Sequence, residues 1–356
     1  MFLKKKFTTI DIGTDSIKAV KFFKKKNELI VDGFAMKSLP YQSIKDGKIV
    51  DEAVVANRLE DISNELNCRN DRIVTSIASN NLIIRNMELP AMDNEEQLAE
   101  AIKWESEDHL PFPVDSAVED FITLDRKGEL LEILLVATKK DMLDNLLSVF
   151  GRIGIMPAVV NIQPMALMSI IDYQNRIDDT MAVVDIGNAG TRVIIGDSKN
   201  IYLSRNLDLG GAEFTKVFMD EHKINYNEAE NMKKKKGIQE DDSSEDLDLA
   251  MAQIATTGMV ESQYIISIAN NLADQIARSL DYYSMKYRNK VKKIYLTGGG
   301  SRLKRLDEII SDKIGRDLEI LNPYNNLRVR DSQGMRDEEF AIAVGLGLSE
   351  VLNDEG

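Results

Sequence analysis

The strongest constraint on the fold of this chain is a short step that occurs twice, an aliphatic residue followed by Asp-Ile-Gly. The first copy surrounds Asp11 and the second surrounds Asp185, and each lies between segments rich in β-branched and aliphatic residues. Such segments favour strands, and the glycine permits a tight turn between them. A strand–turn–strand unit in both halves indicates an internal duplication, so the sequence predicts two related lobes with one acidic turn in each.

Length and composition agree with a folded protein of two lobes. The chain has 356 residues, 43% apolar and 29% charged, and a single core stops growing at roughly 250–300 residues. These values exclude intrinsic disorder and a disulfide scaffold. The net charge of −14 argues against nucleic-acid binding, because phosphate backbones need clustered positive charge. The single cysteine, Cys68, and the lack of an apolar run near the ~20 residues that span a bilayer favour a cytoplasmic location.

A segment between the two repeats, residues 81–139, carries its own set of elements. These are a strand over Leu82–Leu89, a helix that Asp93 or Asn94 caps and that runs to about Asp108, and strands over Ala117–Leu124 and Leu130–Thr138. We therefore predict a small inserted α/β subdomain. It contains the only tryptophan, Trp104, for which a place in the subdomain core is the preferred interpretation and a role as a peptide anchor is the alternative.

Apolar periodicity predicts further helices, which run over Glu52–Leu66, Asp141–Phe150, about Gly258–Lys286, Leu306–Ile314 and Phe340–Leu352. A run of four lysines, Lys233–Lys236, precedes the acidic stretch Glu240–Asp246, and this change of charge predicts the end of a helix followed by a surface loop.

The two Asp-Ile-Gly turns have the residue types that hold a phosphate together with a divalent cation. Backbone N–H groups of a glycine turn suit phosphate oxygens, and a carboxylate reaches Mg²⁺ through water. Thr14, Ser16 and Lys18 add two hydroxyls and the only nearby cation to the first turn, and Asn188 and Thr191 add polar groups to the second. The alternative is that each aspartate only completes a β-turn.

A third glycine segment, Thr297 to Ser301, contains three consecutive glycines between a predicted strand and a predicted helix. Glycine lets a ligand approach the backbone there. The segment lacks the lysine and the spacing of a P-loop, and a plain loop is the alternative.

In this order and spacing, the three segments resemble the phosphate-1, phosphate-2 and adenosine motifs of the actin, Hsp70 and sugar-kinase superfamily. Within it the chain is most similar to the PilM family of type IV pilus assembly proteins and to the related FtsA family. Supporting stretches are Arg85–Pro90, Ala101–Glu105 with Leu110–Pro113, Leu135–Lys140, Ser204–Arg205 with Gly210–Thr215, and Glu228–Lys233. The resemblance implies an α/β fold of the actin-like, ribonuclease H-like type, with two lobes and an inserted 1C-type subdomain.

The resemblance also implies a domain division. Lobe I, the 1A-like part, would comprise residues 1–80 and 140–180, and the 1C-like subdomain residues 81–139. Lobe II, the 2A/2B-like part, would comprise residues 181–356, with 2B over about 212–270.

The resemblance further implies an ATP site. Asp11 and Asp185 would hold Mg²⁺ through water, and Gln163 would lie near the attacking water, where a neutral amide is a poor base. Together these three are the implied catalytic residues. The residues implied to contact phosphates are Gly13, Thr14, Ser16, Lys18, Gly187, Asn188 and Thr191. The other implied nucleotide contacts are Gly210, Gly211, Glu230, Lys233, Gly298, Gly299, Gly300 and Ser301. Because Asn188 stands where related proteins often carry an acid, any ATPase activity is expected to be slow.

The implied function is that of a cytoplasmic ATP-binding scaffold of type IV pilus assembly at the inner face of the cell membrane. Its implied partner is the cytoplasmic N-terminal tail of a PilN-like protein, bound in the groove between 1A and 1C. Other inner-membrane platform proteins and the motor ATPase are further implied partners. Contact with the membrane would be indirect, and self-association stays open. The alternatives are a filament-forming, membrane-tethered protein like FtsA and a small-molecule kinase of the same superfamily.

Overall fold

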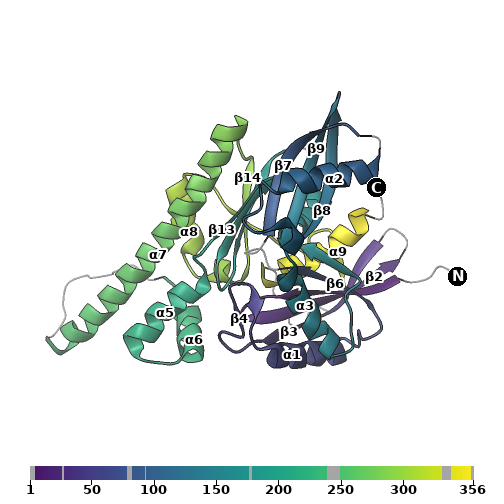
Figure 1. The fold of residues 1–356 in the computed structure, drawn as a ribbon. Helices are drawn as coiled ribbons and strands as arrows, with labels where there is room; N and C mark the ends of the chain where they lie inside the picture. Colours follow the sequence, from purple (N-terminus) through teal and green to yellow (C-terminus); the bar gives the residue numbers. More distant parts are fainter. Residues whose placement is uncertain are drawn as a thin grey trace.

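Two mixed β-sheets and a smaller three-stranded sheet organise the chain (Figure 1). The structure is a computed structural model that describes residues 5–25, 28–77, 82–92, 94–175, 179–238, 249–330 and 338–353. The predicted acidic loop Glu240–Asp246 and the alternative helix cap Asp93 lie outside these residues.

The first sheet has the strand order β10-β6-β1-β2-β3-β16. Its strands are β1 (Lys5–Ile12), β2 (Ser16–Lys25), β3 (Glu28–Ser38), β6 (Arg72–Ile77), β10 (Val159–Ile162) and β16 (Arg328–Val329). The first three form an antiparallel meander, and β6 and β10 extend it in parallel. The short strands β4 (Ile44–Lys45) and β5 (Lys48–Ile49) form a separate hairpin.

The second sheet has the strand order β13-β12-β11-β14-β15. Its strands are β11 (Met181–Ile186), β12 (Thr191–Gly196), β13 (Ile201–Leu207), β14 (Lys293–Thr297) and β15 (Glu319–Ile320). Here too a meander of three antiparallel strands is extended by two parallel ones. The two sheets therefore share one topology around β1 and β11, which confirms the duplication predicted from the repeat.

Two helices, α4 (Gln163–Asn175) and α9 (Ala341–Asn353), join the sheets through one hydrophobic core. This core contains Phe22 of the first sheet and Val183 of the second. The helices approach closely because Gly345 has no Cβ, which would collide with the backbone of Ala166. Since α9 and β16 both lie on the first sheet, the end of the chain returns to that sheet although the predicted division assigns it to lobe II.

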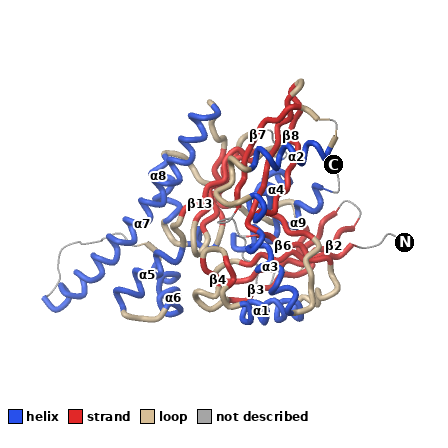
Figure 2. Tube along the Cα trace, viewed as in Figure 1, coloured by secondary structure: helices blue, strands red, loops and turns tan. Residues whose placement is uncertain are grey.

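The remaining helices cover the outer faces of the two sheets (Figure 2). Those on the first sheet are α1 (Glu52–Glu65) and α3 (Lys140–Arg152), and those of the second half are α5 (Gly211–His222), α6 (Tyr226–Lys236), α7 (Leu249–Tyr287) and α8 (Leu306–Ile314). The long helix begins earlier than predicted, and α4, α5 and α6 were not predicted as separate helices. In Figure 1, α5 and α6 lie beside the lower half of α7.

The segment between the repeats forms the third sheet, and we call it the inserted subdomain. It consists of β7 (Leu82–Pro90), α2 (Glu95–Ser106), a 3-10 turn η2 (Val114–Ser116), β8 (Ala117–Lys127) and β9 (Leu130–Lys139). The Asn94 side chain accepts hydrogen bonds from the first turn of α2, which confirms the predicted cap. Leu98 and Ile102 of α2 pack on Ile133 and Leu135 of β9.

The core interpretation of Trp104 is wrong, because its side chain is 75% exposed. The reason lies in the helical repeat. Ile102 faces the sheet with 2% exposure, and a residue two positions later points about 200° away from it. The only tryptophan of the chain therefore lies on the outer surface of the inserted subdomain.

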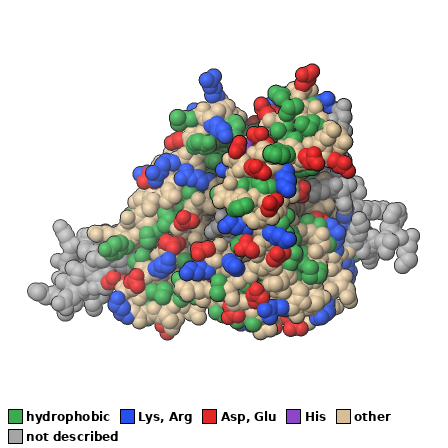
Figure 3. Space-filling model, viewed as in Figure 1, with side chains coloured by type: hydrophobic (Ala, Val, Ile, Leu, Met, Phe, Trp, Pro, Cys, Tyr) green, Lys and Arg blue, Asp and Glu red, His purple; other side chains and the backbone are tan. Residues whose placement is uncertain are grey.

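Acidic and basic side chains are interspersed over the face of the molecule shown in Figure 3. Among the residues that the structure describes, no helix is long and apolar enough to cross a membrane.

Candidate functional site

The two repeated aspartates lie at corresponding points of the two sheets. Asp11 near the end of β1 is 3% exposed, and Asp185 near the end of β11 is 8% exposed. The turns that follow them have the same form, because the N–H groups of Gly13 and Gly187 each donate to the carbonyl oxygen three residues later, at 3.1 and 2.9 Å. The duplication therefore gives each half a buried carboxylate beside a glycine turn.

Both turns open into one cavity of about 820 Å³, a volume within the range of small-molecule sites. It also brings together most of the residues implied by the resemblance. These are Asp11, Gly13, Thr14, Ser16, Lys18, Gln163, Asp185, Gly187, Asn188, Thr191, Gly211, Glu230, Lys233, Gly298, Gly299 and Gly300. Residues far apart in the sequence thus line one space.

Three of the implied residues have structural roles in or beside the cavity wall. Gly210 and Ser301 are not among the lining residues. A Cβ on Gly210 would collide with the backbone of the second turn, and Ser301 Oγ donates to the carbonyl of Gly298 at 2.6 Å. The Thr191 hydroxyl donates to the carbonyl of Leu209 at 2.6 Å, so it fixes the turn even though it borders the cavity.

The first turn does not hold the only cation near the carboxylates, which corrects the expectation from the sequence. Lys18 stands opposite Asp11 across the pair β1 and β2. Arg192 stands opposite Asp185 across β11 and β12, and its Nη1 donates to Asp185 Oδ2 at 3.0 Å. Both side chains of this second pair are almost buried, at 11% and 10% exposure.

Gln163 begins α4 and contacts the first carboxylate directly. Its Nε2 donates to Asp11 Oδ1 at 3.1 Å, and its side chain is buried. Burial raises the pKa of Asp11, and the negative charge of Asp185 adds to this effect against the opposing charge of Lys18. The amide of Gln163 therefore holds a carboxylate that is costly to keep ionised.

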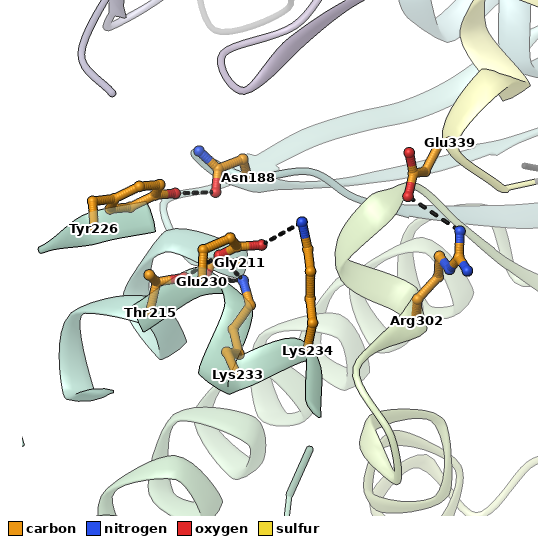
Figure 4. Close-up of polar contacts among 9 residues, drawn as sticks. All are labelled: Asn188, Gly211, Thr215, Tyr226, Glu230, Lys233, Lys234, Arg302 and Glu339. Carbon is orange, nitrogen blue, oxygen red and sulfur yellow. Dashed lines mark hydrogen bonds and ion pairs between the residues drawn. The ribbon is translucent and has the colours of Figure 1, made fainter. Parts of the chain in front are cut away.

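A second polar cluster lies where α5 and α6 meet (Figure 4). Lys233 Nζ donates to the carbonyl of Gly211 and to Thr215 Oγ1, both at 3.0 Å, and pairs with Glu230 Oε2 at 2.6 Å. Burial alone would raise the pKa of Glu230, but Lys233 and its hydrogen bonds hold it below the ordinary value. Lys234 pairs with the other oxygen, Glu230 Oε1, at 3.2 Å and stays 59% exposed.

These contacts give the two neighbouring lysines different tasks. All three ammonium hydrogens of Lys233 have acceptors inside the protein, so it positions Glu230. Lys234 also borders the cavity, and its exposed ammonium group can meet a ligand.

The triple-glycine segment forms another wall of the cavity. Gly298 has a φ of +86°, and a Cβ there would collide with Asp185 Oδ1, so only glycine allows this approach. The next turn, η3 (Gly299–Arg302), leads to an ion pair of 3.2 Å between Arg302 and Glu339. In Figure 4 this pair stands apart from Lys234.

A pair of stacked tyrosines joins the two halves of the chain beside the cavity. The rings of Tyr41, which follows β3, and Tyr226, the first residue of α6, have centroids 4.0 Å apart and an interplanar angle of 13°. The Tyr226 hydroxyl donates to Asn188 Oδ1 at 2.8 Å. This bond fixes the side chain of Asn188, which borders the cavity, to the first residue of α6.

The two carboxylates of the site can hold Mg²⁺ when phosphate oxygens supply further ligands. Among the described residues, no group of three or more His, Cys, Asp or Glu side chains could hold a metal ion. Asp11 and Asp185 supply two carboxylates, and Mg²⁺ in nucleotide sites takes one or two carboxylates together with phosphate oxygens. The donor set therefore matches a metal–nucleotide complex better than a free metal ion.

Sequence reasoning missed several residues that border the cavity, which are Asp15, Arg192, Lys234, Arg302 and Glu339. The signal that could have found Arg192 is the repeat itself, because a basic residue follows each aspartate at the same spacing. The sequence carries no comparable signal for Arg302 and Glu339, whose meeting depends on the packing of the last helix.

Comparison with known proteins shows what this chain is similar to. The family model of the type IV pilus assembly protein PilM matches residues 9–351. The cell division protein FtsA of Bacillus subtilis (strain 168) is 24% identical in an alignment 381 positions long, gaps included, which covers 96% of this chain and 82% of FtsA. A chain of the PilM-PilN type IV pilus biogenesis complex superposes with a TM-score of 0.81 at 23% identity, covering 97% of this chain and 98% of its own.

MreB5 of Spiroplasma citri bound to ADP has a TM-score of 0.51 at 15% identity and covers 99% of both chains. These likenesses show the fold, which is the two-lobed actin-like fold that the resemblance implied.

Proposed function

The chain belongs to the PilM family of type IV pilus assembly proteins, and from this membership we propose that it is an actin-like, nucleotide-binding scaffold of the pilus assembly machinery. The observation that carries the proposal is the match of the family model to residues 9–351, which include both acidic turns and the inserted subdomain. On this proposal, nucleotide and partner bind to different parts of one chain.

The proposed nucleotide is ATP, with its phosphates against the two glycine turns and its ribose toward Glu230. The cavity volume, the paired carboxylates and the exposed ammonium group of Lys234 support this orientation. Asp11 and Asp185 would hold Mg²⁺ together with the phosphates, and the ion would neutralise phosphate charge when bound.

We propose that ATP serves mainly as a bound ligand. Gln163 is a neutral amide that already donates to Asp11, so it orients groups near the phosphates but is a poor base. Hydrolysis, where it occurs, is therefore proposed to be slow. Nucleotide occupancy would then bias the relative orientation of the lobes.

The proposed partner is the cytoplasmic tail of a PilN-like membrane protein, bound in the groove between the first lobe and the inserted subdomain. An extended tail suits a free sheet edge, and β8 pairs with β9 alone among the described strands. Val118 and Ile122 on β8 are 37% and 42% exposed, and Trp104 is exposed on the same subdomain. Such a tail would bring the protein to the inner face of the membrane, beside other platform proteins and the motor ATPase.

Equilibrium dialysis with labelled ATP and MgCl₂ tests the nucleotide proposal. We expect one ATP per chain, little product over time, and weaker binding in Asp185→Ala. Asp281→Ala, on the exposed surface of α7, is the matched control and should bind like the wild type. Fast turnover that rises with an added small acceptor would instead support a kinase.

A titration with a synthetic PilN-like tail tests the partner proposal. Labelled-peptide anisotropy reports binding, and Trp104, the only tryptophan, reports whether the subdomain surface is covered. Ile122→Lys should abolish binding, whereas Ile320→Lys, at a 46% exposed isoleucine of β15, should not. Equal binding by both variants would contradict the assignment to the inserted subdomain.

The relationship to FtsA makes filament formation the second candidate function. Sedimentation of the full chain with and without ATP tests it. Pelleting that depends on ATP would support a filament-forming role.

A further inference from the structure

The duplication repeats more than the two acidic turns, since it places one basic residue directly across the strand pair from each aspartate. Asp11 is opposite Lys18 in the register of β1 and β2, and Asp185 is opposite Arg192 in the register of β11 and β12. Both basic residues border the cavity. Each half of the site therefore has one acidic and one basic residue at opposite positions of a strand pair.

Arg192 has the geometry of a residue that is held in place and still able to bind. Its Nη1 donates to Asp185 Oδ2 at 3.0 Å, which fixes the guanidinium group beside this carboxylate. Its Nε is buried and has no hydrogen-bond partner within the described part of the chain. The hydrogen-bonding capacity of this guanidinium group is therefore incompletely used within the protein, and its 11% exposed fraction borders the cavity, where a ligand with acceptor oxygens can meet it.

Phosphate is the part of the proposed nucleotide that a guanidinium group binds best. Its planar fork carries five N–H donors and stays charged, and phosphate oxygens can take two of them at once. The carboxylate of Asp185 uses one donor. The remaining donors of Arg192 are thus the counterpart of the Lys18 ammonium group, which lies above the first turn.

The formal charges of the four residues cancel. The carboxylates of Asp11 and Asp185 alone would repel a triphosphate and would need a divalent cation between them and the phosphates. With Lys18 and Arg192 opposite them, these two carboxylates are balanced in formal charge before any metal ion binds.

We propose that Arg192 is a phosphate-binding residue, the second-half equivalent of Lys18, and that the pair lets this site bind nucleoside triphosphate with little dependence on a divalent cation. The inference rests on the proposed nucleotide function and deepens it. Asp185 then has two partners, Arg192 at all times and Mg²⁺ when the metal–nucleotide complex is present.

The test is the dissociation constant of ATP for the full chain, measured once in MgCl₂ and once in EDTA. The wild type should lose less than about tenfold in affinity without Mg²⁺. In EDTA, Arg192→Gln should bind ATP at least about tenfold more weakly than the wild type, a loss of about 1.4 kcal/mol or more, because it lacks the charged hydrogen-bond donors. Mg²⁺ should restore part of this loss. Arg192→Lys keeps the charge without the fork and should be intermediate. Arg205→Gln, at an exposed position on β13, is the control and should bind like the wild type.

The outcomes separate the inference from the function on which it rests. A wild type that binds ATP only with Mg²⁺ would overturn the inference and leave nucleotide binding intact, and so would equal affinities of the wild type and Arg192→Gln in EDTA. A wild type that binds no ATP in either buffer would overturn the nucleotide function itself. Since Arg192→Gln leaves Asp185 without its ion pair, circular dichroism checks its folding, and Arg192→Lys repeats the test in a variant that keeps the buried charges balanced.

Discussion

The two aspartates of the site should respond in opposite ways when each is made neutral. Asp185 is paired with Arg192 at 3.0 Å, and both side chains are about nine-tenths buried. Asp11 is buried in surroundings that raise its pKa, so its carboxylate is less favourable there than in water. Asp185→Asn should therefore destabilise the free protein, whereas Asp11→Asn should not.

The size of the effect follows from the geometry. At 3.0 Å and an effective dielectric constant near 20, the Coulomb attraction is about 5.5 kcal/mol before desolvation is subtracted. Breaking a buried ion pair on one side typically costs about 3–5 kcal/mol, because the remaining charge stays buried. We expect the lower end, about 3 kcal/mol, since the oxygen of asparagine can still accept from Arg192. Asp11→Asn should leave the free energy of unfolding within about 1 kcal/mol or raise it.

Urea denaturation followed by circular dichroism, at pH 7 in EDTA and without nucleotide, measures both changes. The absence of ligand matters because bound nucleotide stabilises the folded state by mass action. Equal losses in the two variants would refute the reasoning, since it depends on the different neighbours of the two carboxylates.

Three further predictions concern the rest of the molecule. Lys233→Ala should lower the free energy of unfolding by about 2–4 kcal/mol, because it leaves the buried carboxylate of Glu230 without its main partner. Lys234→Ala should change the free energy of unfolding by less than about 1 kcal/mol, since this lysine is exposed. Urea denaturation measures both, and similar losses in the two variants would contradict this prediction. The pKa of Glu230 lies below its ordinary value of 4.5, so its stabilising contribution is complete above that pH and is lost as the pH falls through the folded pKa. The difference in unfolding free energy between wild type and Glu230→Gln should shrink accordingly on acidification, and a difference that grows would be evidence against the ion pair. Gly345→Ala should cost about 1–3 kcal/mol by forcing α9 away from α4, whereas Gly151→Ala, where a Cβ meets no atom within 4 Å, should cost nothing in a thermal melt.

Much of the fold could be predicted because its signals are local. The β-branched and aliphatic segments around each aspartate predicted a strand–turn–strand unit in each half, a capping asparagine marked the start of α2, and the glycine after each aspartate marked a turn. The repeated step indicated the shared topology of the two sheets before any contact was known. The candidate phosphate turns follow from the same residues, since their backbone form depends on glycine.

Other features depend on contacts between distant segments, which no local pattern contains. Lys233 and Lys234 are adjacent members of one lysine run in the sequence, and only the packing of α6 against α5 buries the first and leaves the second exposed. Trp104 is apolar and was expected in the subdomain core. Leu98 and Ile102 occupy the side of α2 that faces the sheet, so Trp104 lies on the opposite, exposed side. The missed helix α4 meets α9 only because residues far apart in the chain share a core.

The sequence by itself determined the duplicated architecture and the two acidic turns, because turns and alternating strands are properties of neighbouring residues. Tertiary structure decided the electrostatics of the site. Whether Asp185 faces a metal ion, a phosphate or a cation depends on the strand register that sets Arg192 against it, and on Gly298, which lets a third segment approach the same carboxylate. Charge balance in a buried site is set by distances across strands, and the linear order of residues does not specify them.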